Sequence, residues 1–177
     1  MGIEKYLPLL SLKKKKSLSI VSINSKDLWK VIYFFKKHSQ YQYKSLSCIS
    51  CTDFPSLTNR FIITYELLSV QFNRRLRIKI NVNEATHVHS VSKVFICSDW
   101  WEREIWDMFG VFFYNHPDLR RILTDYGFLG YPLRKDFPLT GFTNTFYDNS
   151  KKRVSNNMLE LSQEYRLYDY SSPWSQM

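Results

Sequence analysis

The sequence lacks several features on which membrane proteins and enzymes depend. No segment approaches the roughly 18 uninterrupted apolar residues that a transmembrane helix requires, although 44% of the residues are hydrophobic. No phosphate-binding loop, no nucleophile with a base at a defined offset and no set of metal ligands at a recognised spacing is evident. The sequence therefore predicts a soluble chain that has no catalytic centre of its own.

Cysteine is scarce, with only Cys48, Cys51 and Cys97. An odd number in a chain without a secretory signal predicts reduced thiols. Cys48 and Cys51 form one CxxC motif with no second motif to complete a zinc site. Their segment is strand-like, and an offset of three in a strand places the two thiols on opposite faces. We expect buried or edge cysteines; the alternatives are a metal site or a redox pair in a stand-alone enzyme.

The first sixteen residues, MGIEKYLPLLSLKKKK, match no common targeting signal. Their apolar stretch is short, is broken by Pro8, and has its lysines after it rather than before it. We expect residues 1–16 to form a basic amino-terminal segment. If the protein works in an organelle, we expect it to be made there.

The formal net charge of +9 would suit an acidic partner, an anionic membrane surface or RNA. The basic residues are scattered along the chain, which favours a solvated surface for most of them. An RNA-binding module remains an alternative, but the sequence has no paired aromatic motif of the kind that stacks bases.

The pattern between residues 17 and 123 predicts a compact α+β domain. A helix is expected after a cap at Asn24 or Ser25, because Leu28, Ile32 and Phe35 recur at helical spacing. Residues 88–95 are expected to form a short helix. Alternation of apolar and polar residues predicts four strands that build a mostly antiparallel or mixed sheet, at 17–23, 43–52, 60–69 and 71–82.

A second helix is predicted from Ser98 or Asp99 to Phe109, where Gly110 ends it. If Asp99 is the cap, Glu102 stands at the third helical position and completes a capping box. Arg103 and Asp107 are i,i+4 neighbours and are expected to pair with each other. The carboxylates could in principle do acid–base chemistry, but neither a nucleophile nor a metal ligand accompanies them.

The residues after this helix carry turn signals and charge. Because Pro117 restricts the residue before it to extended backbone, we expect His116 to serve a turn by hydrogen bonding to the backbone or a carboxylate. Arg120 and Arg121 are adjacent, so we expect them to point in different directions.

Residues 124–177 are rich in aromatics, prolines and glycines and have no helical periodicity. A flexible linker would be poor in aromatics, and a segment this long without helices is uncommon inside a compact domain. We expect an extended carboxyl-terminal tail that lies across a partner; disorder is the alternative. Arginine forks and aromatic anchors beside carboxylates suit a protein interface.

The motifs that carry a resemblance are Glu102-Arg-Glu, Asp107-Met-Phe-Gly, His116-Pro-Asp-Leu-Arg-Arg and Pro132-Leu-Arg-Lys-Asp-Phe-Pro-Leu-Thr-Gly. They span about 40 residues. In these motifs the chain resembles the 30-kDa subunit family of respiratory complex I, the C subunit of the bacterial enzyme. Glu160-Leu-Ser-Gln-Glu-Tyr-Arg and the closing Ser172-Pro-Trp resemble the mitochondrially encoded type.

The resemblance implies a fold and a role. A compact α+β domain would be followed by a tail that clasps the large 49-kDa subunit of the quinone module. The chain would hold no cofactor, while the complex uses FMN, iron–sulfur clusters, NADH and ubiquinone. It would have no catalytic residues and would lie in the matrix-facing arm at the mitochondrial inner membrane, where electron transfer is coupled to proton translocation.

The resemblance also implies which residues serve structure and assembly. A matching subunit of a chloroplast-type quinone oxidoreductase or of a membrane-bound hydrogenase is the related alternative. Nucleic acid is not an expected partner. The residues carried over as assembly positions are Glu102, Arg103, Glu104, Asp107, His116, Asp118, Arg120, Arg121, Arg134, Lys135 and Asp136.

Overall fold

The computed structural model describes residues 9–15, 18–163, 165–172 and 174. The chain divides into two compact units, Met1–Lys135 and Asp136–Met177. Among the helices of the described residues, none combines the length and the apolar character needed to cross a membrane.

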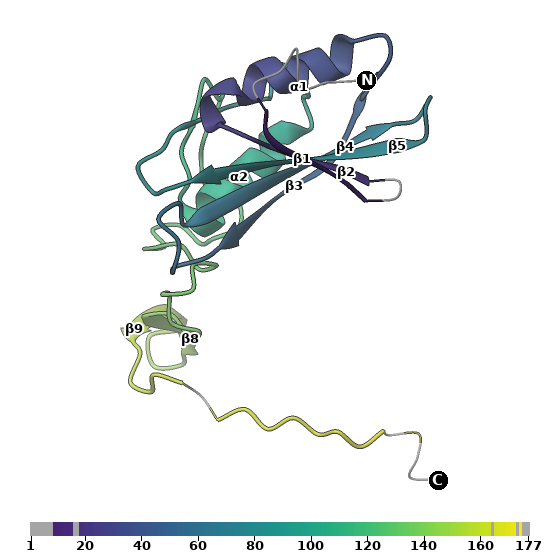
Figure 1. The fold of residues 1–177 in the computed structure, drawn as a ribbon. Helices are drawn as coiled ribbons and strands as arrows, with labels where there is room; N and C mark the ends of the chain where they lie inside the picture. Colours follow the sequence, from purple (N-terminus) through teal and green to yellow (C-terminus); the bar gives the residue numbers. More distant parts are fainter. Residues whose placement is uncertain (1–8, 16–17, 164, 173, 175–177) are drawn as a thin grey trace. The chain divides into compact units, whose positions relative to one another are not determined.

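The first unit is built on a five-stranded mixed sheet (Figure 1). β2 and β5 are parallel, and every other neighbouring pair is antiparallel. The α+β class and the mixed sheet predicted from the sequence are confirmed. The strands lie in the order β1 (Leu9–Lys15), β2 (Leu18–Ile23), β5 (Arg74–Val82), β4 (Phe61–Ser69) and β3 (Ser45–Asp53).

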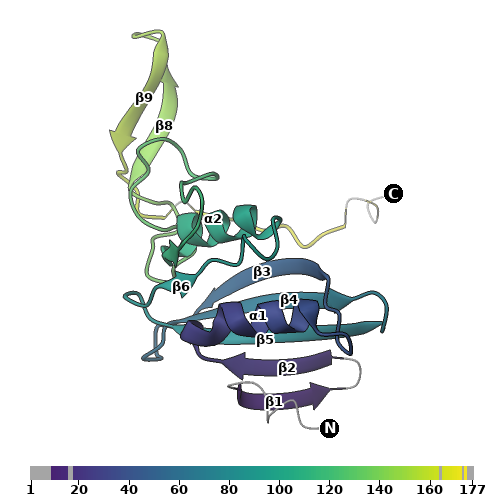
Figure 2. The same cartoon turned by 90° about the horizontal axis from the view of Figure 1, so that it is seen from above.

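One face of the sheet forms the core with two helices. In β4 every second side chain from Phe61 is buried, which is the alternation that a one-sided sheet requires. α1 (Leu28–Lys37) lies over this face (Figure 2) and buries Leu28, Val31, Ile32 and Phe35. α2 (Ser98–Phe109) lies beside β3, and the Phe109 ring centroid is 6.2 Å from that of Phe61. Each such side chain contributes about 1.5–3 kcal/mol on burial.

The predicted helix over residues 88–95 is wrong. Val88–His89 form β6, which pairs in parallel with β7 (Phe113–Tyr114), and a chain of turns leads from there to α2. The apolar residues Val91, Val94 and Phe95 of this segment are buried. The helix does not form because the backbone N–H of Val91 and the hydroxyl of Ser90 both donate to a buried carboxylate on α2.

The ends of the first unit differ from the expected boundaries. Residues 9–15 of the predicted basic segment form β1 and belong to the sheet, while residues 1–8 and 16 lie outside the described residues. The unit continues to Lys135 rather than ending at residue 123. Its last loop stays packed because the N–H of Leu133 donates to the Met108 carbonyl at 3.1 Å. A 3-10 turn, Ser25–Asp27, precedes α1, and β5 begins at Arg74 rather than at residue 71.

The second unit contains a hairpin that the sequence did not predict. β8 (Thr143–Asp148) and β9 (Arg153–Met158) are antiparallel. The Asp148 carboxylate accepts the N–H of Ser150 at 2.9 Å and fixes the turn. After the hairpin the described residues from 159 onward form neither an α-helix nor a strand. Two residues of the quoted tail motifs, Glu164 and Pro173, lie outside the described residues.

Buried carboxylates and the candidate assembly surface

Three carboxylates of the first unit, those of Asp53, Glu102 and Asp107, have fully buried side chains. A buried charge costs several kcal/mol unless hydrogen bonds compensate it. Each of the three carboxylates accepts hydrogen bonds from segments that are distant in sequence. They therefore connect separate parts of the chain.

Asp107 fastens the loop after residue 119 to α2. Its Oδ2 accepts the backbone N–H groups of Ile122, Leu123 and Thr124 at 3.2, 2.7 and 2.9 Å. Its Oδ1 accepts the Thr124 hydroxyl at 2.6 Å and Nη1 of Arg121 at 3.2 Å. Burial acts to raise the pKa of Asp107, but the hydrogen bonds from Thr124 and its neighbours outweigh burial and hold the pKa below its ordinary value.

The expected pair between Arg103 and Asp107 is not formed. Nε of Arg103 donates to the Arg120 carbonyl at 3.2 Å, and its guanidinium lies 5.4 Å from the Trp100 ring. The local i,i+4 contact is replaced because residues 121–124 of the returning loop offer Asp107 five donors. Sequence spacing alone cannot reveal such a competitor.

Two arginines fasten the same loop at the carboxyl end of α2. Arg121 donates through Nη1 and Nη2 to the Gly130 carbonyl, both at 3.0 Å. Nε of Arg134 donates to the Phe109 carbonyl at 2.7 Å, and its guanidinium lies 4.6 Å from the Tyr131 ring. A cation at this end satisfies a free carbonyl and suits the helix dipole.

Asp53 joins β3 to the last residues of the unit. It forms a two-pronged ion pair with Arg60, at 2.6 and 2.8 Å. The N–H of Lys135 also donates to Asp53 Oδ2 at 2.8 Å. Glu84 contacts Arg60 at 2.9 Å and Arg134 at 3.5 Å, so one acidic residue serves both arginines.

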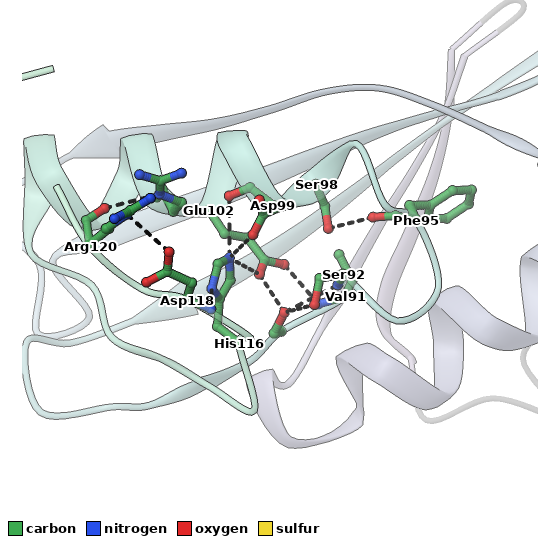
Figure 3. A network of polar contacts seen from close by, with 11 residues as sticks. Val91, Ser92, Phe95, Ser98, Asp99, Glu102, His116, Asp118 and Arg120 are labelled. Carbon is green, nitrogen blue, oxygen red and sulfur yellow. Dashed lines mark hydrogen bonds and ion pairs between the residues drawn. The ribbon is translucent and has the colours of Figure 1, made fainter. Parts of the chain in front are cut away.

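Glu102 holds the turns that replace the expected helix (Figure 3). Its Oε2 accepts the Ser90 hydroxyl at 2.6 Å, and its Oε1 accepts the Val91 N–H at 2.8 Å. Burial raises the pKa of Glu102 to about 7, with these hydrogen bonds opposing and the Asp99 charge assisting the rise. The predicted capping box is therefore wrong. The N-cap of α2 is Cys97, without a side-chain cap, and Glu102 points into the domain.

His116 serves a turn, as the sequence predicted. Its Nδ1 accepts the Asp118 N–H at 3.1 Å. Its Nε2 lies 3.0 Å from Asp99 Oδ1 and 3.7 Å from Glu102 Oε2, with the imidazole fully buried between them. This places a histidine and two carboxylates in one cluster (Figure 3).

The remaining predicted positions do not join this buried set. Arg120 and Asp118 form an exposed ion pair at 3.0 Å, so Arg120 and Arg121 point in different directions, as expected. Glu104 is half-buried, and Lys135 and Asp136 are exposed. Within the first unit, the predicted residues therefore separate into buried side chains that bind other segments of the chain and a few exposed charges.

The two cysteines of the CxxC motif lie on opposite faces of β3. Cys48 is opposite Glu66 and Cys51 is opposite Ile63 in the register with β4. Both are free thiols, and burial, followed by the Asp53 charge, raises the pKa of Cys51 to about 12. Within the described part of the chain, no group of three or more His, Cys, Asp or Glu side chains could hold a metal ion. The pair is not placed for thiol redox chemistry.

Exposed apolar side chains mark the surface that a partner could cover. In the first unit, Ile96 is 88% exposed beside a cavity of about 350 Å³ before α2, a feature that the sequence pattern did not reveal. Among the described residues of the second unit, the large exposed hydrophobic ones are Leu139, Phe142, Phe146, Tyr147, Val154, Met158, Leu161, Tyr165, Leu167, Tyr168, Tyr170 and Trp174.

Comparisons with known proteins agree on one family. NADH-ubiquinone oxidoreductase subunit 9 of Prototheca wickerhamii is 56% identical over 82% of this chain and 76% of its own length. The Reclinomonas americana protein of the same name is 52% identical over 85% and 74%. NADH dehydrogenase [ubiquinone] iron-sulfur protein 3 of Solanum tuberosum is 48% identical over 86% and 80%.

A solved structure shares the fold. A chain of the membrane-bound sulfane sulfur reductase, an archaeal respiratory membrane complex, aligns with a TM-score of 0.64 at 20% identity, over 76% of this chain and 80% of that one. Residues 21–143 match the family described as respiratory-chain NADH dehydrogenase, 30 Kd subunit. With identities of about one half over most of its length, the chain belongs to the 30-kDa subunit family of the respiratory-chain NADH dehydrogenase.

Proposed function

We propose that this chain is a scaffold subunit of the quinone module in the peripheral arm of complex I, NADH:ubiquinone oxidoreductase. It supports electron transfer from NADH to ubiquinone, coupled to proton translocation, without a cofactor or catalytic residue of its own. Family membership and the names of the similar proteins support the enzyme assignment. FMN and the iron–sulfur clusters belong to neighbouring subunits in this proposal. Its place is the matrix side of the mitochondrial inner membrane, and its gene is organellar.

The observation that carries the proposal is the exposed apolar surface of residues 136–174. Tyr165, Tyr168 and Tyr170 are 84%, 73% and 90% exposed, and Trp174 is 84% exposed. Isolated soluble domains rarely leave such a density of large apolar side chains in water. Tyrosine and tryptophan are the residues enriched among binding hot spots. A surface of this composition is stable when another polypeptide covers it, and the 49-kDa subunit is the partner that we propose.

The buried polar groups fit a scaffold better than a catalyst. Asp53, Asp107, Arg121 and Arg134 all hold one segment of this chain to another. Segments held in place in this way lose less conformational entropy when a partner binds them.

Related respiratory complexes supply a second candidate. The fold shared with the archaeal membrane complex would suit the equivalent subunit of another NAD(P)H–quinone oxidoreductase or of a membrane-bound hydrogenase. Purification of the complex by an affinity tag on this chain, followed by activity assays, distinguishes the two candidates. NADH-dependent reduction of ubiquinone by the purified complex supports complex I, and hydrogenase activity supports the alternative.

The role in assembly is tested by replacing Tyr165, Tyr168 and Tyr170 with alanine. We expect the amount of assembled complex on native gels to fall by tenfold or more, while NADH:ubiquinone activity per assembled complex stays unchanged. Replacement of the same three residues with phenylalanine keeps the rings and serves as one control. Arg166→Ala, an exposed change between the tyrosines, serves as the other. Normal assembly with reduced turnover would overturn the proposal.

A further inference from the structure

The face of the sheet away from α1 and α2 is the strongest unassigned surface of the first unit. We call it the open face. Along β5 it presents Arg75, Arg77 and Lys79, because Leu76, Ile78 and Ile80 point into the core. Asn81 completes the row on β5. The registers of β1, β2, β4 and β3 with their neighbours add the other described side chains, which are Ser11, Lys13, Leu18, Ile20, Ser22, Ile62, Thr64, Glu66, Leu68, Ser45, Cys48, Ser50 and Thr52.

The charge of the open face is one-sided. Its described residues include four cations, Lys13, Arg75, Arg77 and Lys79, but Glu66 is their single carboxylate. Glu66 forms an ion pair with Arg77. Among the described residues, no ion pair is found for Arg75 or Lys79. Cations at every second position of a strand lie about 6.6 Å apart and repel each other, so the folded chain keeps a repulsion that carboxylates from outside would relieve.

The cations are set among aliphatic side chains. In the registers, Arg77 lies beside Ile20, and Arg75 lies beside Leu68. Ile20, Ile62 and Leu68 are half-buried without any covering helix of their own. A surface that mixes half-buried aliphatic groups with arginines resembles the composition of protein interfaces more than that of a solvated face.

We infer that the open face binds an acidic surface of a neighbouring polypeptide in the assembled complex. Carboxylates of that polypeptide pair with Arg75 and Lys79, and its apolar groups cover Ile20, Ile62 and Leu68. Five strands about 4.8 Å apart, paired over about six residues each, give a face on the order of 500 Å². This is a little over half of the roughly 800 Å² that one partner contributes to a standard protein interface. The inference rests on the proposed function for the presence of neighbours, but it concerns a surface separate from the carboxyl-terminal unit.

Protein is favoured over RNA and lipid by the side chains themselves. The described residues of the open face include no Phe, Tyr, Trp or His, so bases have nothing on which to stack. Ile20, Ile62 and Leu68 are half-buried rather than protruding, so they cannot insert into a bilayer.

The inference is tested first by zero-length carbodiimide coupling in the purified complex. The reagent joins an amine directly to a carboxylate. We expect peptides that contain Lys79 or Lys13 to be linked to Asp or Glu of another subunit. Solvated Lys30 and Lys37 on α1 supply the comparison within the same sample. Absence of any link from the open-face lysines would overturn the inference. It would also be overturned if these lysines became reactive only after nuclease treatment or lipid extraction, because RNA or lipid would then be what covers them.

Charge reversal supplies the second test. The double variant Arg75→Glu and Lys79→Glu should lower the amount of assembled complex by tenfold or more. The matched variant Lys30→Glu and Lys37→Glu carries the same change of net charge on the opposite side of the sheet, and it should assemble normally. Replacing the linked carboxylate of the partner with lysine should restore assembly of the Lys79→Glu variant. The inference is contradicted if both double variants fail to assemble, or if the lysine substitution in the partner does not restore assembly of the Lys79→Glu variant.

The two proposals fail in different ways. If the chain does not co-purify with an NADH:ubiquinone oxidoreductase, the proposed function fails. If it co-purifies and depends on its tyrosines, but assembles normally with both open-face cations reversed, only the further inference fails.

Discussion

The Thr124 hydroxyl donates to the Asp107 carboxylate at 2.6 Å across 17 positions of sequence. With the three backbone N–H groups that share the same carboxylate, this contact converts a loop with no regular structure into a fixed part of the first unit. The loop then carries the chain to Tyr131 and Arg134 at the end of α2.

Asp107→Asn should destabilise the full chain by about 3–5 kcal/mol, because it leaves Arg121 without its buried partner and weakens four further hydrogen bonds. Urea unfolding at pH 7 measures the effect. The matched change Thr124→Val removes one of the donors and should cost about 1 kcal/mol. Since folding lowers the pKa of Asp107, its contribution is present above the unfolded pKa near 4 and fades as pH falls below it. Equal stability of Asp107→Asn and the native chain would refute this account.

Glu102 should make stability depend on pH in the opposite sense. Its pKa rises from 4.5 to about 7 on folding, so the folded chain binds more protons than the unfolded chain between these values. Stability from this group therefore falls as pH rises from about 4.5 to 7 and is level above that. The His116 Nε2 atom lies 3.7 Å from Glu102 Oε2, and the Asp99 charge assists the rise of the Glu102 pKa.

The matching variant is Glu102→Gln, which keeps the shape and removes the titration. Urea unfolding from pH 4.5 to 8 should show a decline of about 3 kcal/mol in the native chain and a flatter curve in the variant. Ser90→Ala, which removes a hydrogen bond to the ionised carboxyl, should steepen the decline. An unchanged curve in Glu102→Gln would show that another group titrates.

Gly110 should resist substitution more than a second glycine of similar backbone. Its φ is +76°, and an added Cβ would lie 2.6 Å from the Tyr131 ring and 2.8 Å from Nη2 of Arg134. Gly127 has a φ of +72° but nothing within 4 Å. Thermal unfolding should show a loss of about 1 kcal/mol for Gly127→Ala, from the left-handed backbone alone. Gly110→Ala should lose at least 2 kcal/mol in total, because the ring must also move. Similar losses in both variants would mean that the ring is not fixed there.

The cysteines should be slow to react. Because the pKa of Cys51 is about 12, its thiolate fraction at pH 8 is on the order of 10⁻⁴. Alkylation of the full chain with iodoacetamide at pH 8, followed by mass spectrometry, should label exposed Cys97 before Cys51. Cys51→Ser should leave electron transfer by the complex unchanged. Rapid labelling of Cys51, or loss of activity in the serine variant, would restore the redox reading.

Local pattern was enough where neighbours in sequence are also neighbours in space. The strand at residues 60–69 and the helix that ends at Gly110 follow from alternation and from a glycine in the left-handed region. The turn at His116 follows from Pro117. The 30-kDa family signature is likewise a matter of residue types at fixed spacings, so the sequence by itself determined the α+β class and the family.

Only the tertiary structure decided which charges face inward. Glu102 could have capped its own helix, and Arg103 could have paired with Asp107 four residues away. Instead Glu102 accepts hydrogen bonds from Ser90 and Val91, and Asp107 accepts hydrogen bonds from the loop at residues 121–124. These donors come from segments more than ten residues away, and burial makes each carboxylate take the most complete set of donors within reach. Spacing along the chain identifies the possible local partners of each carboxylate. Only folding brings the distant hydrogen-bond donors close enough to replace those local partners.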